Sequence, residues 1–210
     1  MNKIKAVIFD MDGVLIDARE WHYEALNYAL AYFGFEISRT DHLLTFDGLP
    51  TSRKLDMLSK ISGLPERLHS LINALKQKHT MRMIYQECGI NFVHKYALSR
   101  LKREGYSLAV ASNSIRKTVD AMMEQAKLAE YLSFSLSNED VSAAKPDPEI
   151  YSLAISRLGL KPSECLIVED NPRGIEAAKG SGAFVLEVGS VEDVTYEAIA
   201  DRIFNIELIN

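Results

Sequence analysis

Short apolar runs, separated by polar and helical stretches, form the main pattern of the chain. Residues 6–9, 108–111 and 166–168 contain only apolar side chains. Such runs are typical of strands in a parallel sheet that is covered on both faces. Residues 134–137 and 183–188 are also rich in apolar side chains and predict two further strands. We expect all of these strands to share one sheet.

Helical patterns alternate with the strands over the second half of the chain. Asp147-Pro148 and Asn171-Pro172 each place a capping side chain before a proline, which is typical of a helix start. Gly159 and Gly180 are placed to end these two helices. This alternation predicts an α/β fold with a Rossmann-like parallel sheet as its core. Two more helices are expected over residues 97–104 and 119–128.

The stretch after Asp17 has apolar positions at helical spacing and no strand pattern. Three helices in one stretch exceed what a minimal crossover between two strands needs. We therefore expect an inserted all-helical domain, residues 18–84, within an α/β core formed by residues 1–17 and 85–210. The apolar positions of the three helices are Trp21, Ala25, Leu26, Ala29, Leu30 and Phe33 before Gly34; Leu55, Leu58 and Ile61; and Leu68, Leu71, Ile72 and Leu75.

Composition and charge narrow the set of partners and compartments. The chain has 210 residues, 47% of them hydrophobic, and a net charge of −5, so no overall positive field attracts a nucleic acid or an anionic membrane surface. No apolar run reaches the ~20 residues of a membrane-spanning helix. Met1-Asn2-Lys3 leads into the first strand without a signal-peptide pattern, which indicates the cytoplasm. Cys88 and Cys165 lack metal-ligand spacing, and we expect two free thiols.

Polar side chains follow three of the predicted strands. Asp10 and Asp12 come after the first strand, and because strand side chains alternate, both point to the same side. Two adjacent carboxylates repel each other unless a cation lies between them or one pKa is raised, so the pair indicates a divalent metal, a raised pKa, or both. Ser112-Asn113 and Glu169-Asp170 end two other strands. Ligands bind at the carboxyl edge of an open parallel sheet, so we expect these groups to form one site.

Each of these features taken singly also has a structural interpretation. An Asp-Gly pair after a strand is common turn chemistry, and Glu169-Asp170 before Asn171-Pro172 is a plausible helix cap. A loop lysine such as Lys145 is usually solvated. The joint occurrence of these features in one order favours a functional site.

The ordered motifs resemble those of the haloacid dehalogenase superfamily. Within it, the chain is most similar to the branch that holds β-phosphoglucomutase, phosphoglycolate phosphatase and related sugar phosphate phosphatases. The resemblance implies an enzyme, a phosphoric monoester hydrolase, whose inserted helices form a cap that closes over the active site and decides the substrate. The motifs are Phe9-Asp10-Met11-Asp12-Gly13-Val14-Leu15, Ser112-Asn113, Lys145-Pro146-Asp147-Pro148, and Glu169-Asp170-Asn171-Pro172-Arg173-Gly174 with Ala177-Ala178 and Gly182.

The resemblance also implies a role for each motif residue. Asp10 is the nucleophile that forms an aspartyl-phosphate, and Asp12 protonates the leaving oxygen and then activates water. Ser112 and the backbone amide of Asn113 bind the transferring phosphate, whose charge Lys145 neutralises.

Mg²⁺ is the cofactor that the resemblance implies. Asp10, Asp170 and the backbone carbonyl of Asp12 would hold the ion, with Glu169 close by or acting through water.

In the cap, four residues are candidates for substrate binding, and each has a structural alternative. His22 lies where related enzymes carry a histidine beside the acid-base aspartate, although a single histidine on an amphipathic helix is more often structural. Gly48 and Arg53 belong to a loop similar to the family's specificity loop, where a basic residue suits a second phosphate or a carboxylate. The alternative is a solvated helix start. Lys76 or Lys78 fits the role of the family's cap lysine. The remaining histidines are expected to be structural: His42, His69, His79 and His94.

Two positions depart from the family pattern. Ala18 stands where relatives commonly have Ser or Thr, whose hydroxyl lies near the acid-base aspartate, so the tuning of Asp12 is open. Ile90-Asn91-Phe92-Val93-His94 replaces the usual Pro-Gly turn before the helix that leads to Ser112. This second departure affects the expected cap hinge rather than the chemistry.

The predicted function is a Mg²⁺-dependent phosphatase, monomeric or weakly dimeric, that acts on a small phosphorylated metabolite such as a sugar phosphate. The same catalytic residues would serve a β-phosphoglucomutase-type isomerase, in which the phosphoryl group returns to a sugar instead of passing to water. A third hypothesis is a catalytically idle protein that binds a metabolite or partner in the same pocket. The intact motifs argue against it. Dehalogenation is disfavoured, because family dehalogenases need neither a metal nor the second carboxylate.

Overall fold

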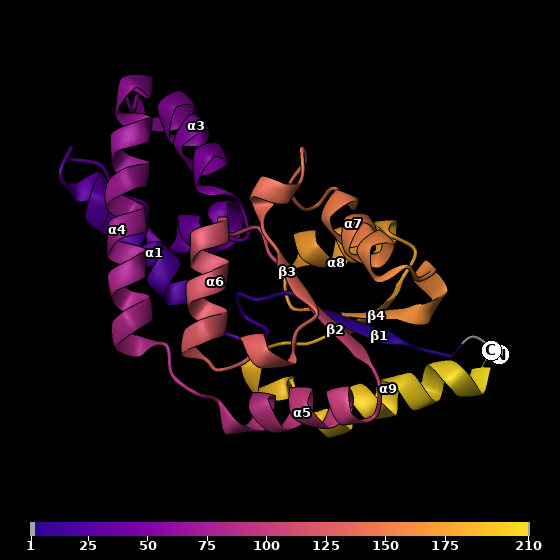
Figure 1. Cartoon of the computed structure of the whole chain (residues 1–210). Coiled ribbons are helices and arrows are strands. Elements are labelled where there is room, and N and C mark those ends of the chain that lie inside the picture. Colours follow the sequence, from indigo (N-terminus) through magenta and orange to yellow (C-terminus); the bar gives the residue numbers. More distant parts are fainter. Residues whose placement is uncertain (1–2, 210) are drawn as a thin grey trace. The chain divides into compact units, whose positions relative to one another are not determined.

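A five-stranded parallel sheet forms the centre of the larger part of the chain (Figure 1). The computed structural model describes residues 3–209. The strand order is β3-β2-β1-β4-β5, which confirms the predicted parallel α/β fold. The strands are β1 (Ala6–Phe9), β2 (Ser107–Ala111), β3 (Phe134–Leu136), β4 (Cys165–Glu169) and β5 (Phe184–Glu187).

The register of the sheet explains why its central strands are so apolar. In β1, Ile8 pairs with Ala109 on one side and Ile167 on the other, and all the side chains of β1 are buried. The edge strand β5 is only partly buried. Because β1, β2 and β4 are parallel neighbours, their carboxyl ends lie at the same edge of the sheet.

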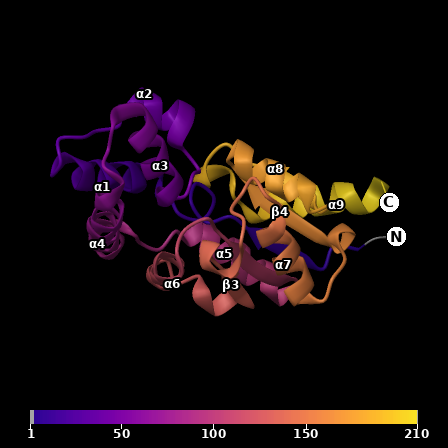
Figure 2. The ribbon, with the colours of Figure 1, turned by 90° about the horizontal axis from the view of Figure 1, so that it is seen from above.

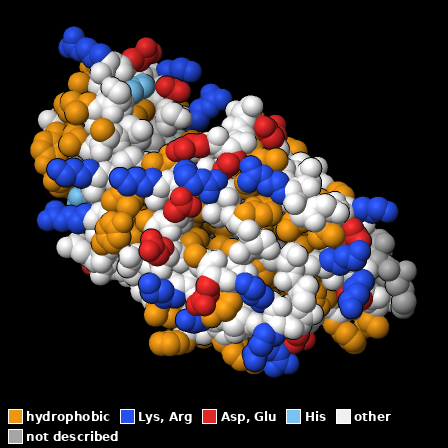
Figure 3. Space-filling model, viewed as in Figure 1, with side chains coloured by type: hydrophobic (Ala, Val, Ile, Leu, Met, Phe, Trp, Pro, Cys, Tyr) orange, Lys and Arg blue, Asp and Glu red, His pale blue; other side chains and the backbone are white. Residues whose placement is uncertain are grey.

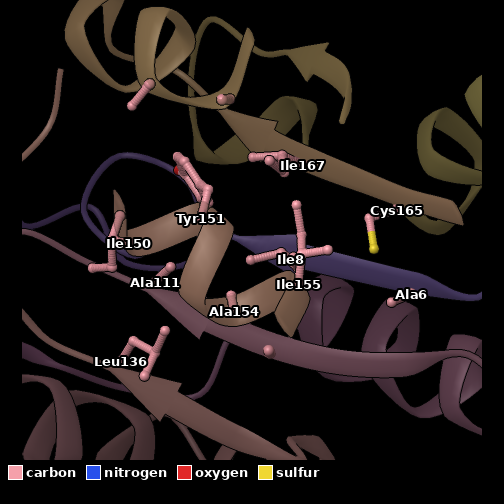
Figure 4. Close-up of a cluster of buried hydrophobic side chains, with 13 residues drawn as sticks. Ala6, Ile8, Ala111, Leu136, Ile150, Tyr151, Ala154, Ile155, Cys165 and Ile167 are labelled. Atoms are coloured by element: carbon pink, nitrogen blue, oxygen red, sulfur yellow. The ribbon is translucent and has the colours of Figure 1, made fainter. Parts of the chain in front are cut away.

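Helices pack on both faces of this sheet. Figure 1 shows α7 and α8 on one side of the sheet and α5 and α9 on the other, and Figure 2 shows α7 and α8 from above. The cluster in Figure 4 lies between the sheet and α7 and α8, and Tyr151 and Ala154 of α7 belong to it together with Ile8 of β1. The helices are α5 (Phe92–Arg103), α6 (Arg116–Gln125), α7 (Glu149–Leu158), α8 (Pro172–Gly180) and α9 (Tyr196–Ile209). Short 3₁₀ turns are η3 (Ala129–Tyr131), η4 (Asn138–Asp140), η5 (Pro162–Glu164) and η6 (Val191–Asp193).

Several helix bounds differ from those expected. The helix expected over residues 119–128 is α6, which begins at Arg116 and ends at Gln125, before Lys127 adopts a positive φ of 57°. Asp147 is not the N-cap of α7. Pro148 occupies that position, and Asp147 Oδ1 accepts a hydrogen bond from the amide of Glu149 at 2.9 Å. The expected cap at Asn171 is confirmed, since its side chain accepts the amide of Arg173.

The segment between β1 and α5 is helical. It forms a compact unit, Ala18–Glu87, separate from the unit formed by the rest of the chain. The unit ends at Glu87 rather than at residue 84, because α4 continues unbroken to that point. Residues 1, 2 and 210 of the expected core lie outside the described residues. The elements are α1 (Arg19–Ala31), α2 (Arg39–Asp41), the π-helical turn η1 (His42–Phe46), α3 (Thr51–Ser62), η2 (Glu66–Leu68) and α4 (His69–Glu87).

The helical unit has an apolar core of its own. Leu26 and Leu30 of α1, Leu55 of α3 and Ile72 of α4 are buried in it together. Two positions expected on the buried faces are exposed instead, and they are Ile61 and Leu71. Ile61 lies in the last turn of α3 and Leu71 near the start of α4, where a helix end is less completely covered by its neighbours.

The surface carries charges of both signs. On the face shown in Figure 3, cationic and anionic side chains are interspersed. Cys88 and Cys165 are free thiols, as predicted. Among residues 3–209, no helix combines the length and the apolar character that crossing a lipid bilayer requires. The cytoplasmic location stays a prediction.

Candidate active site

The end of β1 carries the first two site residues into a tight turn. Asp10 is 8% exposed, and its amide donates to the carbonyl oxygen of Val168 in β4 at 3.0 Å. Gly13 follows with a φ of +91°, a backbone conformation that L side chains rarely adopt. The chain can therefore turn directly after Asp12, which leaves both carboxylates at the carboxyl edge of the sheet.

Lys145 is the cation at the centre of the site. Its Nζ lies 2.5 Å from Asp10 Oδ1, 2.7 Å from Glu169 Oε1 and 2.7 Å from the hydroxyl of Tyr151. The ammonium also lies 4.5 Å from the centroid of the Tyr151 ring, a cation–π distance. Only 4% of Lys145 is exposed. Lys145 thus meets groups from β1, β4 and α7 in a buried ion-pair cluster.

Glu169 is saturated with hydrogen bonds. Its Oε1 accepts from Lys145 and from the Tyr151 hydroxyl at 2.9 Å, and its Oε2 accepts the amides of Asp170 and Asn171 at 2.9 and 3.0 Å. A carboxylate offers about four acceptor positions. Glu169 therefore holds Lys145 and the turn after β4 in place, and little of its capacity is left for a direct bond to a metal.

The charges around Asp10 shift its pKa in opposite directions. Burial raises the pKa of Asp10 well above its usual range, and Glu169, Asp12 and Asp170 add to the rise, while Lys145 opposes it. Burial lowers the pKa of Lys145, but the nearby Asp10 and Glu169 outweigh this effect, so its pKa is raised. Lys145 is therefore charged, and the acidic groups around it exceed its single positive charge.

Two glycines make room for the carboxylates of β4 and its following turn. A Cβ on Gly13 would lie 2.2 Å from Asp170 Oδ2, and a Cβ on Gly174 would lie 1.7 Å from Glu169 Oε1. Atoms cannot approach so closely, so each carboxylate occupies space that exists only because the residue is glycine. Gly13 belongs to the β1 turn, and it brings Asp170 against the backbone next to Asp12.

Three carboxylates converge closely enough to share one cation. One oxygen each from Asp10, Glu169 and Asp170 lies within 4.8 Å of the others. Hard oxygen donors and the cradle that Gly13 leaves for Asp170 fit a small divalent ion such as Mg²⁺.

Asp12 is oriented by hydroxyl groups from the loop after β2. Ser114 Oγ donates to Asp12 Oδ2 at 2.9 Å, and Ser112 Oγ lies 3.5 Å from the same oxygen. The amide of Ser114 donates to Ser112 Oγ at 3.0 Å, which fixes the two serines relative to each other. Two hydroxyl groups from the loop after β2 thus contact the Asp12 carboxylate.

Asn113 holds the backbone of Lys145. Its Oδ1 accepts the amide of Lys145 at 3.1 Å, and its Nδ2 lies 3.5 Å from the Lys145 carbonyl oxygen. This side-chain contact was not predicted, since the sequence suggested a role only for the Asn113 backbone amide. It couples the loop after β2 to the lysine loop, so the two phosphate-binding candidates are positioned together.

Two of the candidates in the helical unit, His22 and Lys76, contact each other, and the other two lie apart from this pair. Lys76 Nζ lies 3.3 Å from His22 Nδ1, and Lys76 is only 6% exposed, whereas Lys78 is more exposed. The choice between Lys76 and Lys78 as the substrate-binding lysine stays a prediction. Gly48 has a φ of +70°, and Arg53 is exposed on α3, where its neighbour Lys54 is buried instead.

Two site residues were missed by sequence reasoning. Tyr151 lies on α7, where its aromatic side chain is one of several apolar residues at helical spacing, so its hydroxyl contact with Lys145 gave no signal. Ser114 follows Ser112 by two residues, and that alternation was the one available indication that both hydroxyls point to the same side.

The fold and this site define an enzyme of the haloacid dehalogenase-like hydrolase family. The family's model matches residues 7–188, most of the chain, and the chain belongs to this family.

Two relatives are similar to this chain over most of the length of both proteins. A phosphorylated carbohydrates phosphatase of Thermotoga maritima is 28% identical over 182 residues, which are 85% of this chain and 82% of the relative. Pyrophosphatase PpaX of Bacillus velezensis is 29% identical over 185 residues, 86% and 81% of the two chains.

Among solved structures, β-phosphoglucomutase from Clostridium difficile superposes with a TM-score of 0.84. The match covers 99% of this chain and 100% of that one at 20% sequence identity. CbbY from Rhodobacter sphaeroides, solved in complex with phosphate, has a TM-score of 0.78 at 24% identity and covers 87% and 84% of the two chains. At these identities the likeness establishes the fold.

Proposed function

We propose that this protein is a Mg²⁺-dependent phosphatase that hydrolyses a small phosphorylated metabolite through a phosphorylated Asp10. The observation that carries the proposal is the buried cluster in which Asp10 faces Lys145 beside Asp170 at the carboxyl edge of the sheet. An anionic nucleophile and a phosphate monoester repel each other, so a fixed cation and hydrogen-bond donors are what this reaction needs.

The first step is a transfer to the enzyme. A carboxylate oxygen of Asp10 attacks the phosphorus, and the bond from phosphorus to the ester oxygen breaks. Asp12 gives its proton to the departing oxygen. Lys145 balances charge on the transferring group, and Ser112 with the amide of Asn113 donates hydrogen bonds to it.

The second step returns the enzyme to its starting state. Water attacks the phosphorus, Asp12 takes the proton of that water, and the bond from phosphorus to Asp10 breaks to release inorganic phosphate. Ser114 supports both steps, because its hydrogen bond orients the Asp12 carboxylate.

Mg²⁺ would be held by Asp10, Asp170 and the backbone carbonyl of Asp12, with Glu169 acting through water because its oxygens already accept four hydrogen bonds. When bound, it supplies positive charge next to the phosphoryl group.

A sugar phosphate is the substrate class that we favour. The support is the similarity to the Thermotoga maritima relative, which is named a phosphorylated carbohydrates phosphatase. Substrate recognition by the Ala18–Glu87 unit, including His22, Gly48, Arg53 and Lys76, stays a prediction. So does the monomeric or weakly dimeric state.

The test is phosphate release from a panel of sugar phosphates. We expect turnover with Mg²⁺, none after chelation, and none for Asp10→Asn, which keeps the shape of the side chain but removes its charge. The matched control Asp201→Asn changes an exposed carboxylate on α9 and should retain activity.

An active Asp10→Asn protein, free of contaminating phosphatase, would refute the role of Asp10 as the nucleophile. Bisphosphate-dependent isomerisation without phosphate release would assign a phosphomutase instead, and no turnover of any kind by folded protein would indicate an idle binding protein.

A further inference from the structure

His94 is a buried histidine that the proposed chemistry does not use. It lies in the first turn of α5, is 1% exposed, and its two ring nitrogens contact backbone oxygens of two distant segments. Nδ1 lies 3.1 Å from the carbonyl oxygen of Leu15, and Nε2 lies 2.8 Å from that of Val191. Carbonyl oxygens only accept hydrogen bonds, and a neutral imidazole carries a single N–H. Each neutral tautomer of the ring therefore donates to one of these two oxygens, and only a ring with protons on both nitrogens donates to both.

The Leu15 contact reaches the turn that carries Asp12. Inside this turn, the Met11 carbonyl accepts the amides of Leu15 and Ile16 at 3.0 and 2.9 Å, and the Gly13 amide donates to the Ile16 carbonyl at 2.8 Å. These bonds close the turn on itself. The carbonyl of Leu15 lies outside this set of bonds and is the one that His94 binds.

The Val191 contact anchors the ring to the segment after β5. Val191 begins η6, and Asp193 Oδ2 in the same turn accepts the amides of Gly189 and Ser190 at 2.9 and 3.0 Å. Just before it, the amide of Val188 donates to the Glu169 carbonyl at 2.9 Å. This anchor is therefore tied to the strand end that carries Glu169.

The backbone of His94 is held as firmly as its ring. Asn91 caps α5, and its Oδ1 accepts the amides of Val93 and His94 at 2.9 and 3.3 Å. With its main chain and both ring nitrogens engaged, the side chain has little freedom to move. The ring is thus a rigid link between the turns that follow β1 and β5.

We propose that His94 is a positioning residue that fixes the Asp12 turn through the carbonyl of Leu15, with Val191 as the anchor. The inference rests on the proposed function, because the link matters for catalysis only if Asp12 is the acid-base residue that it positions. It also explains why a polar, ring-bearing residue occupies a fully buried position in the segment that replaces the usual Pro-Gly turn.

Asn and Gln variants separate the two contacts. An Asn side chain places its amide nitrogen near the position of Nδ1, facing Leu15, whereas the longer Gln reaches toward the position of Nε2, facing Val191. We expect His94→Gln and His94→Leu to lower kcat roughly 10- to 100-fold with little change in KM, since small displacements of a reacting group cost that much. We expect His94→Asn to keep most of the wild-type kcat. All three should lower Tm, because each removes at least one of the two buried contacts between the ring and a carbonyl oxygen.

Amide hydrogen exchange gives a reading that does not depend on activity. Exchange at residues 13–16 should quicken in His94→Gln and His94→Leu and stay near wild type in His94→Asn. Equal losses of kcat in the Asn and Gln variants, or a lower Tm with unchanged kcat in all three, would overturn the positioning role. If the wild-type protein releases no phosphate at all, the proposed function fails. Unchanged exchange in every variant instead shows that His94 does not hold the turn.

Discussion

Single residues determine the electrostatic balance of the site, and Lys145 matters most. The structure places this cation between two carboxylates that would otherwise face each other in a buried position. Removing one partner of a buried ion pair is far more costly than removing an exposed one, because the remaining charges stay buried. The lysine is therefore expected to stabilise the fold as well as to serve the chemistry.

Lys145→Met tests this expectation. We predict a loss of about 3–5 kcal/mol in the free energy of unfolding at neutral pH, since Asp10 and Glu169 lose their shared cation. The loss should shrink as the pH is lowered, because buried carboxyl groups become neutral when they bind protons. Urea unfolding measures both effects. The control Lys179→Met removes an exposed lysine 2.7 Å from Glu187 and should cost less than about 1 kcal/mol. Equal losses in the two variants would contradict the account.

Gly174→Ala tests the space reserved for Glu169. Alanine is favoured over glycine in a helix by about 1 kcal/mol, so propensity alone predicts a more stable α8. The added Cβ would instead lie 1.7 Å from Glu169 Oε1, and we predict a loss of about 1–3 kcal/mol together with reduced turnover. Gly89→Ala is the control, since no atom of the described residues lies within 4 Å of its added Cβ. A stabilised and fully active Gly174→Ala protein would be the contrary result.

At the residue scale, the strand pattern indicated the site groups that end strands, and the family resemblance added Lys145 from a separate loop. Neither indicated Tyr151. Asp10, Ser112 and Glu169 were predictable, because a buried strand that stops at a polar residue places it at a known edge. Tyr151 was not, because its contact with Lys145 depends on how α7 packs on the sheet. Asn113 was found, but for its backbone rather than its side chain.

Among the secondary-structure elements, η1 contains an unusual buried histidine. His42 is 4% exposed, and among residues 3–209 neither of its ring nitrogens has a hydrogen-bond partner. Burial lowers its pKa from 6.5 to about 4, the positive charge of Lys54 adds to the effect, and Asp47 opposes it. The folded unit therefore holds this histidine neutral at a pH where the unfolded chain binds a proton.

A pH-dependent loss of stability follows for the Ala18–Glu87 unit. The stability linked to His42 is fully present above about pH 6.5 and is lost as the pH falls toward about 4, by at most about 3 kcal/mol. Trp21 is the only tryptophan of the chain and lies on α1, so its fluorescence reports the unfolding of this unit. We expect the free energy of unfolding of His42→Phe to fall less between about pH 7 and pH 4.5 than that of the wild type. The same dependence of stability on pH in the variant and the wild type would contradict this.

The strands were predicted better than the helices, for physical reasons. The central strands are runs of buried apolar residues, a pattern that stands out from the rest of the chain. In α4 the buried stripe is Ile72, Lys76, Thr80 and Ile84. Its two polar members interrupt the apolar spacing, so the length of the helix was not visible. The C-terminal α9 was not predicted, although Ile199, Ile203 and Ile206 recur on its buried face.

On the scale of the whole molecule, the site exists because the chain returns repeatedly to one edge of the sheet. Asp10, Ser112, Lys145 and Glu169 are far apart in sequence, yet hydrogen bonds join the loops that carry them. The parallel order β2-β1-β4 accounts for this, since it places three strand ends side by side. The relation between sheet order and site was predictable, whereas the exact contacts required the packed structure.

The most direct test of the central claim is a crystal structure grown with Mg²⁺ and trifluoroberyllate, which mimics a phosphoryl group on a carboxylate. The account predicts trifluoroberyllate on a carboxylate oxygen of Asp10, Lys145 beside it, and Mg²⁺ bound by Asp10 and Asp170. Absence of both at saturating concentrations, or their attachment to a different carboxylate, would contradict it.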